Sequence, residues 1–383
     1  MKPQVWQTIL TALDTWKTYV ATLVIAWSGA YLLTPVAGWL AFRVGAVDLP
    51  GPRKVHAKPM PRLGGVAVFI GFCLPWGGYY LMENRVTETF HNYERLVGAL
   101  FLGSLAMLAL GIYDDVKRLD AIKKLAVQVL VCCGLYLGGY RITGINIPLG
   151  GHWELGWLSL PVSVVWMVGV TNAINLLDGI DGLVPGVTVC IALSLGVINM
   201  LGGNIIVALL TMCLAGAALG FLPHNYSPAR IFLGDSGSLS IGLILSCIGI
   251  LSLFKAATAM LVGVPLLLFA LPLYDTTFVL VRRVIRGDPI FKADRTHVHH
   301  RLLARGFSQK QAAKLLYFVS AALGLAGVLL SFEEALEVLA IPACLIVLMA
   351  VVMWRRSYRP AAAHSPATEA DAAQRAAGQR SSQ

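Results

Sequence analysis

Long apolar runs constrain the fold of this chain more than any other feature. Of its 383 residues, 57% are hydrophobic and only 13% are charged, and the mean hydropathy is +0.71. Runs of about 20 apolar residues can cross a bilayer as helices, which satisfy every backbone polar group within lipid. The sequence therefore predicts an all-α polytopic protein in a lipid bilayer. We expect about eleven transmembrane helices, near 19–42, 64–82, 95–113, 122–139, 158–175, 183–201, 204–222, 237–254, 258–280, 312–331 and 336–354.

Two segments depart from this pattern. Residues 141–160 alternate around a Pro-Leu-Gly-Gly turn and predict a small hairpin on the outer side of the membrane. Residues 360–383 are rich in Ala, Ser and Gln, which predicts a disordered cytoplasmic tail. The remainder, 1–359, is expected to form a single integral-membrane domain.

Basic residues predict the orientation of the chain. Lys and Arg concentrate in alternate loops, and the largest group lies between 282 and 314. Loops rich in Lys and Arg stay in the cytoplasm, so we expect the amino terminus outside and the carboxyl terminus inside. The net charge of +10 is explained in this way. It does not indicate nucleic-acid binding, because the chain has no concentrated soluble basic domain.

One polar stretch stands out at the end of the predicted span 158–175. Asn172, Asn175, Asp178 and Asp181 follow one another at a spacing of three. Four oxygen-bearing side chains at a membrane-helix end carry a high solvation cost unless they have a function, and a hard cation such as Mg²⁺ prefers oxygen ligands. A helix cap with a turn is the alternative, although it needs only one such residue.

Asp114 and Asp115 follow another apolar run. Adjacent helical residues point about 100° apart, so the two carboxylates cannot act identically. We expect one to face a metal or substrate, while the other orients a lysine or a helix end. A solvated helix terminus beside Lys117 and Arg118 is the alternative.

A glycine-flanked acid precedes the span 237–254. Asp235 lies between Gly234 and Gly237, and these glycines let backbone approach a ligand. The amides at that helix start could bind phosphate, and Phe232 offers a face on which a flat base can stack. The alternative is a simple N-cap.

A histidine-rich motif lies in the largest inside loop. His297, His299, His300 and Arg301 suit pyrophosphate oxygens, and we assign them to substrate binding. A zinc site is a rival interpretation, but no cysteine is near. The second rival interpretation is a basic loop that only sets the orientation of the chain in the membrane.

Three further residues complete the candidate site. Lys58 and Arg62 place basic charge at the mouth of the second span, where they could bind an anionic substrate or only set topology. Asp275 lies inside the span 258–280. A buried acid there predicts a residue that is itself functional or that orients a functional neighbour, or a partner for an arginine such as Arg282.

The motifs HxKPxPRxGG, DD, NxxNxxDGxDGL, FLGDSGS and HVHHR, in this order from 48 to 306, resemble the polyprenyl-phosphate N-acetylhexosamine-1-phosphate transferases. The HVHH form is more similar to the branch that transfers N-acetylglucosamine-1-phosphate. The other branch, which transfers N-acetylmuramoyl-pentapeptide phosphate in peptidoglycan synthesis, is the alternative.

The resemblance implies a reaction. A UDP-N-acetylhexosamine donates a sugar phosphate to undecaprenyl phosphate and releases UMP, which starts a cell-envelope glycan at the bacterial inner membrane. Mg²⁺ is the implied cofactor, with Mn²⁺ as a substitute, and a homodimer is left open. By resemblance, Asn175 and Asp235 match the metal positions, and Asp114 or Asp115 matches the base or nucleophile. Phe232 matches a uracil-stacking position, and His299, His300 and Arg301 match diphosphate or sugar contacts.

The other predicted roles are less specific. Asp178 and Asp181 complete the catalytic set by positioning substrate, basic residues or the turn, and Asn172 is expected to contact substrate. A polytopic transporter is a rival function, but its site would lie near the membrane midplane. A CDP-alcohol phosphotransferase is another, but its DGxxAR pattern is absent, because Asp178-Gly179 continues as Ile-Asp-Gly-Leu.

Overall fold

The computed structural model describes residues 3–50, 58–79, 85–147, 151–253, 263–288 and 296–331. The first helices are α1 (Pro3–Val44), α2 (Gly64–Tyr79), α3 (Arg85–Asn92), α4 (Glu94–Lys117), α5 (Ala121–Gly138) and α6 (Ser159–Leu177). They are followed by α7 (Leu183–Leu201), α8 (Ile205–Asn225), α9 (Gly234–Leu253), α10 (Gly263–Leu268), α11 (Ala270–Arg286), α12 (Val298–Leu303) and α13 (Gln309–Leu330). Short strands pair as β1 (Val47–Asp48) with β2 (Met60–Pro61), and as β3 (Gly144–Ile147) with β4 (Gly151–Glu154).

The helices confirm a multi-pass, all-α membrane protein. Within the described residues, eight helices are long and apolar enough to cross a membrane. The number eleven stays a prediction, as does the orientation. The last expected span, 336–354, and the expected tail, 360–383, lie outside the described residues.

The expected single helix over 258–280 is wrong in its described part. The chain forms two helices there, α10 and α11, which meet at Phe269. Pro272 has no N–H to donate to the carbonyl of Leu268, so the regular bonding pattern is interrupted at this point. The helix α3 was also not expected, because its eight residues are polar and too short for a span.

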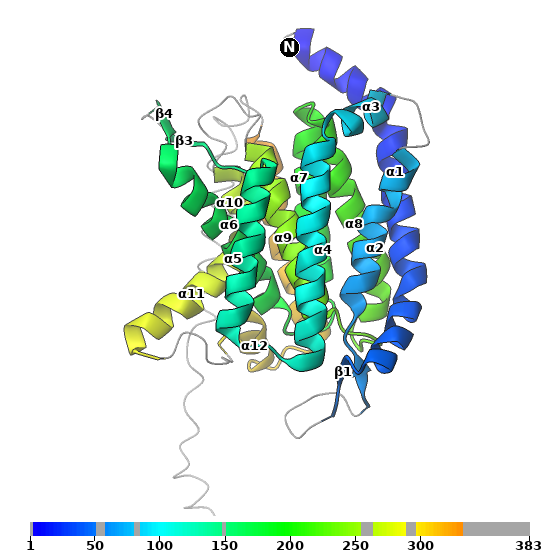
Figure 1. The fold of residues 1–383 in the computed structure, drawn as a ribbon, viewed down its shortest axis with the longest axis vertical. Helices are drawn as coiled ribbons and strands as arrows, with labels where there is room; N and C mark the ends of the chain where they lie inside the picture. Colours follow the sequence, from blue (N-terminus) through cyan, green and yellow to red (C-terminus); the bar gives the residue numbers. More distant parts are fainter. Residues whose placement is uncertain are drawn as a thin grey trace, which may run out of the picture. The chain divides into compact units, whose positions relative to one another are not determined.

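Burial decides which helix lies at the centre. In α9, 89% of the apolar window is buried, whereas in α5 only 17% is. Helices α4 and α6 both pack on α9, while α1 and α7 pack on α8 (Figure 1). Helix α2 comes close to α9 through two glycines, since a Cβ on Gly65 would lie 2.1 Å from the amide nitrogen of Gly237. The start of α9, which carries Asp235, is therefore enclosed by its neighbours.

The predicted hairpin is confirmed, while its place on the outer side stays a prediction. Strands β3 and β4 are antiparallel, with Ile145 opposite Trp153. In Figure 1 this hairpin and α12 lie at opposite ends of the helices. The ends of α4 and α6, the starts of α5 and α9, and β1–β2 share the end that holds α12, so the polar motifs of the sequence meet there.

Candidate active site

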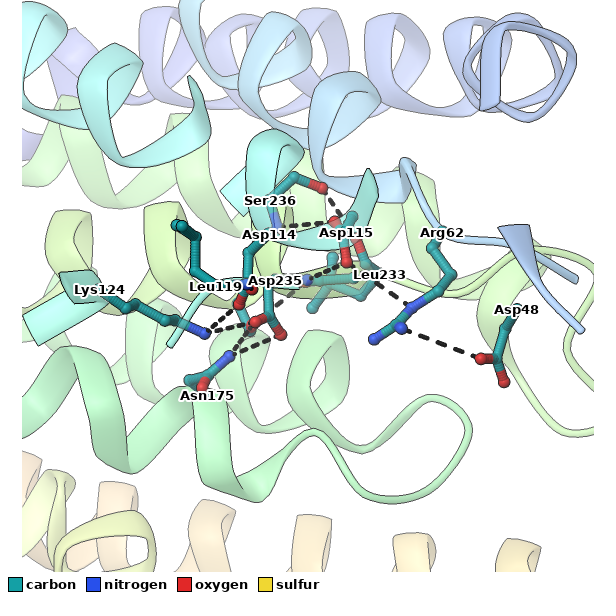
Figure 2. Close-up of polar contacts among 12 residues, drawn as sticks. Asp48, Arg62, Asp114, Asp115, Leu119, Lys124, Asn175, Leu233, Asp235 and Ser236 are labelled. Carbon is teal, nitrogen blue, oxygen red and sulfur yellow. Dashed lines mark hydrogen bonds and ion pairs between the residues drawn. The ribbon is translucent and has the colours of Figure 1, made fainter. Parts of the chain in front are cut away.

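Three membrane helices and one lysine build an acidic cluster, which we define as Asp114, Lys124, Asn175 and Asp235. Lys124 Nζ lies 2.8 Å from Asp114 Oδ2 and also pairs with Asp235 Oδ2. Asn175 donates to Asp235 Oδ1 at 3.1 Å and to Ser238 Oγ at 2.8 Å. Figure 2 shows these side chains converging from the end of α4, the first turn of α5, the end of α6 and the start of α9. The two carboxylates therefore share one positive charge.

Asp115 has a different environment from its neighbour. Its side chain is fully buried and accepts the backbone N–H of Asp235 at 3.0 Å and of Ser236 at 3.1 Å. It therefore caps the amino terminus of α9 from another helix. Arg62 Nε lies 3.6 Å from the same carboxylate and its other end reaches toward Asp48 (Figure 2). Asp115 fixes the helix start that presents Asp235.

The chemistry of the acidic cluster fits a hard divalent cation. Carboxylate and amide oxygens are the ligands that Mg²⁺ prefers, and Lys124 shows that a cation is stable between Asp114 and Asp235. Among the described residues, no three His, Cys, Asp or Glu side chains form a complete ligand set. Water or substrate oxygens would have to complete the coordination.

A cavity of about 400 Å³ opens beside the acidic cluster. Arg62, Asp178, Asp181 and Phe232 are among its lining residues. Asp181 accepts the N–H of Ala229 at 3.0 Å and so holds one wall in place. Burial, reinforced by the negative charge of Asp235, raises the pKa of Asp178 to about 7. The cavity thus combines an aromatic face, a cation and an acid that titrates near neutrality.

Asn172 and Asn175 lie about one turn apart on α6, but they have different hydrogen-bond partners. Its amide donates to Gln128 Oε1 at 2.7 Å and to the carbonyl of Val168 at 2.8 Å. Gln128 is completely buried in α5. Asn172 therefore ties α5 to α6, and it is not among the residues that line the cavity.

A histidine cluster, which we define as His297, His299 and His300 with Asp275, lies on α11 and α12. His297 Nδ1 lies 2.9 Å from Asp275 Oδ2, and the N–H of Val298 donates to Asp275 Oδ1 at 2.8 Å. Asp275 therefore orients His297 and caps α12. In the structure its partner is this histidine and not Arg282, the arginine suggested by the sequence.

His299 lies against the loop after α6. It is 1% exposed, and a Cβ on Gly179 would lie only 1.9 Å from its Nε2. Burial, together with the nearby His300, lowers the pKa of His299 to about 3, so this imidazole is neutral at physiological pH. Only glycine at position 179 lets the ring approach the loop that carries Asp178.

The remaining predicted residues lie around these clusters. The rings of His299 and His300 are 4.3 Å apart between centroids, and the Arg301 guanidinium lies 5.5 Å from the Phe278 ring of α11. Lys58 is exposed just before β2. Zinc stays an alternative prediction, since a carboxylate bonded to a histidine, as Asp275 is to His297, also occurs in metal sites.

Sequence reasoning missed Lys124 as a site residue. As one of the basic residues of the loops, it predicts only the orientation of the chain. The signal was available, because the loop between α4 and α5 is very short and Asp120 caps α5. A lysine in the first turn of α5 must then lie beside the end of α4, where Asp114 is found.

The fold and the site define a multi-pass membrane protein in which two carboxylates share one lysine at one end of the helices. Residues 97–253, which contain the whole acidic cluster, match the model for glycosyl transferase family 4. The chain belongs to this family.

Relatives named as transferases match most of the chain. A probable undecaprenyl-phosphate N-acetylglucosaminyl 1-phosphate transferase of Bacillus subtilis (strain 168) is 34% identical over 87% of this chain and 90% of that protein. The undecaprenyl-phosphate alpha-N-acetylglucosaminyl 1-phosphate transferase of Yersinia pestis is 31% identical over 77% of this chain and 79% of its own length. A phospho-N-acetylmuramoyl-pentapeptide-transferase of Moorella thermoacetica is 30% identical over 73% of this chain and 87% of that protein.

Proposed function

We propose that this protein transfers N-acetylglucosamine-1-phosphate from UDP-N-acetylglucosamine to undecaprenyl phosphate and releases UMP. The observation that carries the proposal is the meeting of Asp114 and Asp235 on one cation at the end of a membrane-helix bundle, beside a cavity lined by Phe232. A lipid phosphate lies at the bilayer surface and a nucleotide sugar lies in water. A site at a helix end can reach both substrates.

The two adjacent aspartates have different roles in this proposal. Asp115 uses both oxygens to hold the start of α9, so it positions Asp235 and does not contact the reacting atoms. Asp114 holds the acceptor end of the site through Lys124. Because a phosphate monoester is already largely ionised at pH 7, Asp114 has little proton to remove and acts mainly in positioning.

The cavity suits the donor. Phe232 offers an apolar face to uracil, and Arg62 brings positive charge toward the diphosphate. In the transfer, an oxygen of the lipid phosphate forms a bond to the sugar-bound phosphorus while the bond to UMP breaks. Trapping a phospho-enzyme from donor alone would contradict this direct transfer and favour a covalent intermediate on Asp114.

A divalent cation completes the proposal. Asn175 and Asp235 would hold Mg²⁺, with Asp114 facing the same point, and the ion would neutralise the phosphate charges during transfer. Lys124, which holds that point now, would then move its ammonium toward substrate phosphate. Mn²⁺ has the same ligand preference and is expected to substitute.

Incubation of purified protein with a panel of UDP-sugars, undecaprenyl phosphate and Mg²⁺ tests this function through UMP release. We expect UDP-N-acetylglucosamine to be the preferred donor. Preferred turnover of UDP-N-acetylmuramoyl-pentapeptide would favour the related peptidoglycan enzyme, which the Moorella thermoacetica relative supports as second candidate. Turnover of a CDP-linked donor, or proton-coupled uptake without UMP release, would contradict the proposal.

We also propose that the site faces the cytoplasm in the bacterial inner membrane. Arg305 is exposed at the end that holds the site, and Trp157 is 83% exposed near the hairpin at the other end. In a cysteine-free background, Arg305→Cys should be labelled in inverted vesicles, and Trp157→Cys only from the opposite side. The reverse pattern would invert the orientation.

A further inference from the structure

Helix α11 exposes an apolar face that no other described helix covers. The exposed fractions are 47% for Tyr274, 43% for Leu280, 49% for Val281, 62% for Val284 and 79% for Ile285. The opposite face is buried at Leu271, Asp275 and Val279, where α11 packs on α6 and holds α12. From Leu280 on, the exposed fraction of these side chains rises toward the carboxyl end of the helix.

Arginines lie on the other side of the same helix end. Arg282 follows Asp275 by seven residues, and Arg286 follows Val279 by seven, so both lie on the Asp275–Val279 face. Arg283 lies close to this face, four residues after Val279. After Asp275 the next acidic residue is Asp288, just beyond the end of the helix. The last turns of α11 are therefore cationic on one side and apolar on the other.

This pattern predicts the position of the helix. Figure 1 shows α11 leading away from α5 and α6 at the end that holds α12. If the helix end lay in water, Val284 and Ile285 would be exposed without a partner. If it crossed the bilayer upright, its last turns would leave the hydrocarbon with Arg282, Arg283 and Arg286, and Val284 and Ile285 beside them would again face water. A helix that lies along the bilayer surface places its apolar face against the acyl chains and its arginines at the headgroups.

We propose that the arginine face of α11 binds the phosphate headgroups of anionic phospholipids. Guanidinium groups pair well with phosphate oxygens, and the anionic surface of a leaflet attracts basic residues beside it. The apolar face would enter the boundary of the acyl chains. This makes α11 a lipid-binding element that is separate from the acidic cluster and the cavity.

Lipid binding would also reach the histidine cluster, which is the part of the inference that rests on the proposed function. The same helix carries Asp275, whose carboxylate holds His297 and the first turn of α12. Headgroups that hold α11 at the surface would hold α12 as well, and with it His299 against Gly179. Activity should then rise with the anionic fraction of the bilayer.

The test uses the full-length protein in vesicles without any substrate. A bimane label at Ile285→Cys, in the cysteine-free background, reports depth by its emission and headgroup preference by energy transfer to labelled phosphatidylglycerol or phosphatidylcholine. We expect the emission of a bimane in apolar surroundings, and more energy transfer to phosphatidylglycerol than to phosphatidylcholine. The preference should fall about fivefold for each arginine replaced in Arg282→Gln, Arg283→Gln and Arg286→Gln.

The matched control removes the same charge at the same end of the protein. Arg305, Lys310 and Lys314 are exposed on or before α13, and their replacement by Gln should leave the preference intact. A water-like emission, an unchanged preference in the α11 triple variant, or an equal loss in the control would overturn the proposal. Since the readout needs no turnover, failure of the proposed enzymatic function would leave this test valid.

Discussion

The acidic cluster and the histidine cluster reach the same end of the protein by different means. The acidic side chains come from helices that are long enough to span the membrane, and α9 is the most buried of these. The histidines lie on or directly before α12, a helix of six residues that Asp275 caps from α11. The match to the family model ends at residue 253 and thus includes only the acidic cluster.

The difference indicates how each cluster keeps its geometry. Packing of several spans fixes the acidic cluster, and Asp115 adds two hydrogen bonds to the start of α9. The histidine cluster depends on one carboxylate and on the absence of a side chain at Gly179. We therefore expect changes in the first cluster to abolish transfer, and changes in the second to alter donor binding.

The largest effect is expected for Asp235→Ala. This change removes a proposed metal ligand and leaves Lys124 and Asn175 without their shared partner. We expect kcat to fall by about 1,000-fold or more, and UMP release to lose its dependence on Mg²⁺. Asp120→Asn, an exposed acid at the start of α5, is the control that should keep its activity. Near-normal turnover of Asp235→Ala would remove this residue from the site.

The adjacent aspartates give the second prediction. Asp114→Asn should lower kcat by about 100-fold with little change in the melting temperature, since its loss leaves α9 capped. Asp115→Asn should instead destabilise the protein by about 1.5–3 kcal/mol, because an amide NH₂ would face the N–H of Asp235 or Ser236. Thermal unfolding and UMP release, measured on both variants, separate the roles. Equal melting temperatures would contradict the capping role.

Much of the site could be predicted because membrane spans restrict where chain segments end. Successive spans joined by short loops return to the same face, so Asp114, Asn175 and Asp235 had to lie at comparable depth. The details depend on how the helices cross. Asn172 and Asn175 are three residues apart, and this 60° rotation directs one toward Gln128 and the other toward Asp235.

Other details had no sequence signal of their own. The cap that Asp115 gives to α9 requires α4 and α9 to be in contact, which no local pattern predicts. The break at Phe269 was missed because proline is tolerated in many membrane helices when neighbours satisfy the freed backbone groups. The partner of Asp275 was missed because His297 follows it by 22 residues, and no local pattern places the two side chains together.

Gly179→Ala tests the histidine cluster and should have a smaller effect. The new methyl group would overlap His299 Nε2 and push α12 away from the loop of Asp178. We expect about a tenfold rise in KM for the UDP-sugar, with a smaller change in kcat. The double variant Gly179→Ala, His299→Ala removes the overlap, so it should be no worse than His299→Ala alone. Additive losses in the double variant would contradict this contact.

The smallest expected effect is the pH dependence of stability through Asp178. Its pKa is about 7 in the folded protein, raised first by burial and then by the charge of Asp235, against about 3.9 in an unfolded chain. Between these values the folded protein binds a proton that the unfolded chain has released. The stabilising contribution is therefore complete below pH 4 and is lost as pH rises through 7. The melting temperature in metal-free buffer should fall by about 2–4 °C between pH 5 and 8.

Asp178→Asn should remove most of this slope, whereas Asp120→Asn should keep it. Mg²⁺ sharpens the test, because a cation beside Asp235 would cancel the negative charge that helps to raise the pKa of Asp178. The descending part of the curve should then move to lower pH in the wild-type protein and stay absent in Asp178→Asn. If Mg²⁺ shifted neither curve, the cation would not bind near Asp235, and the acidic cluster would hold Lys124 alone.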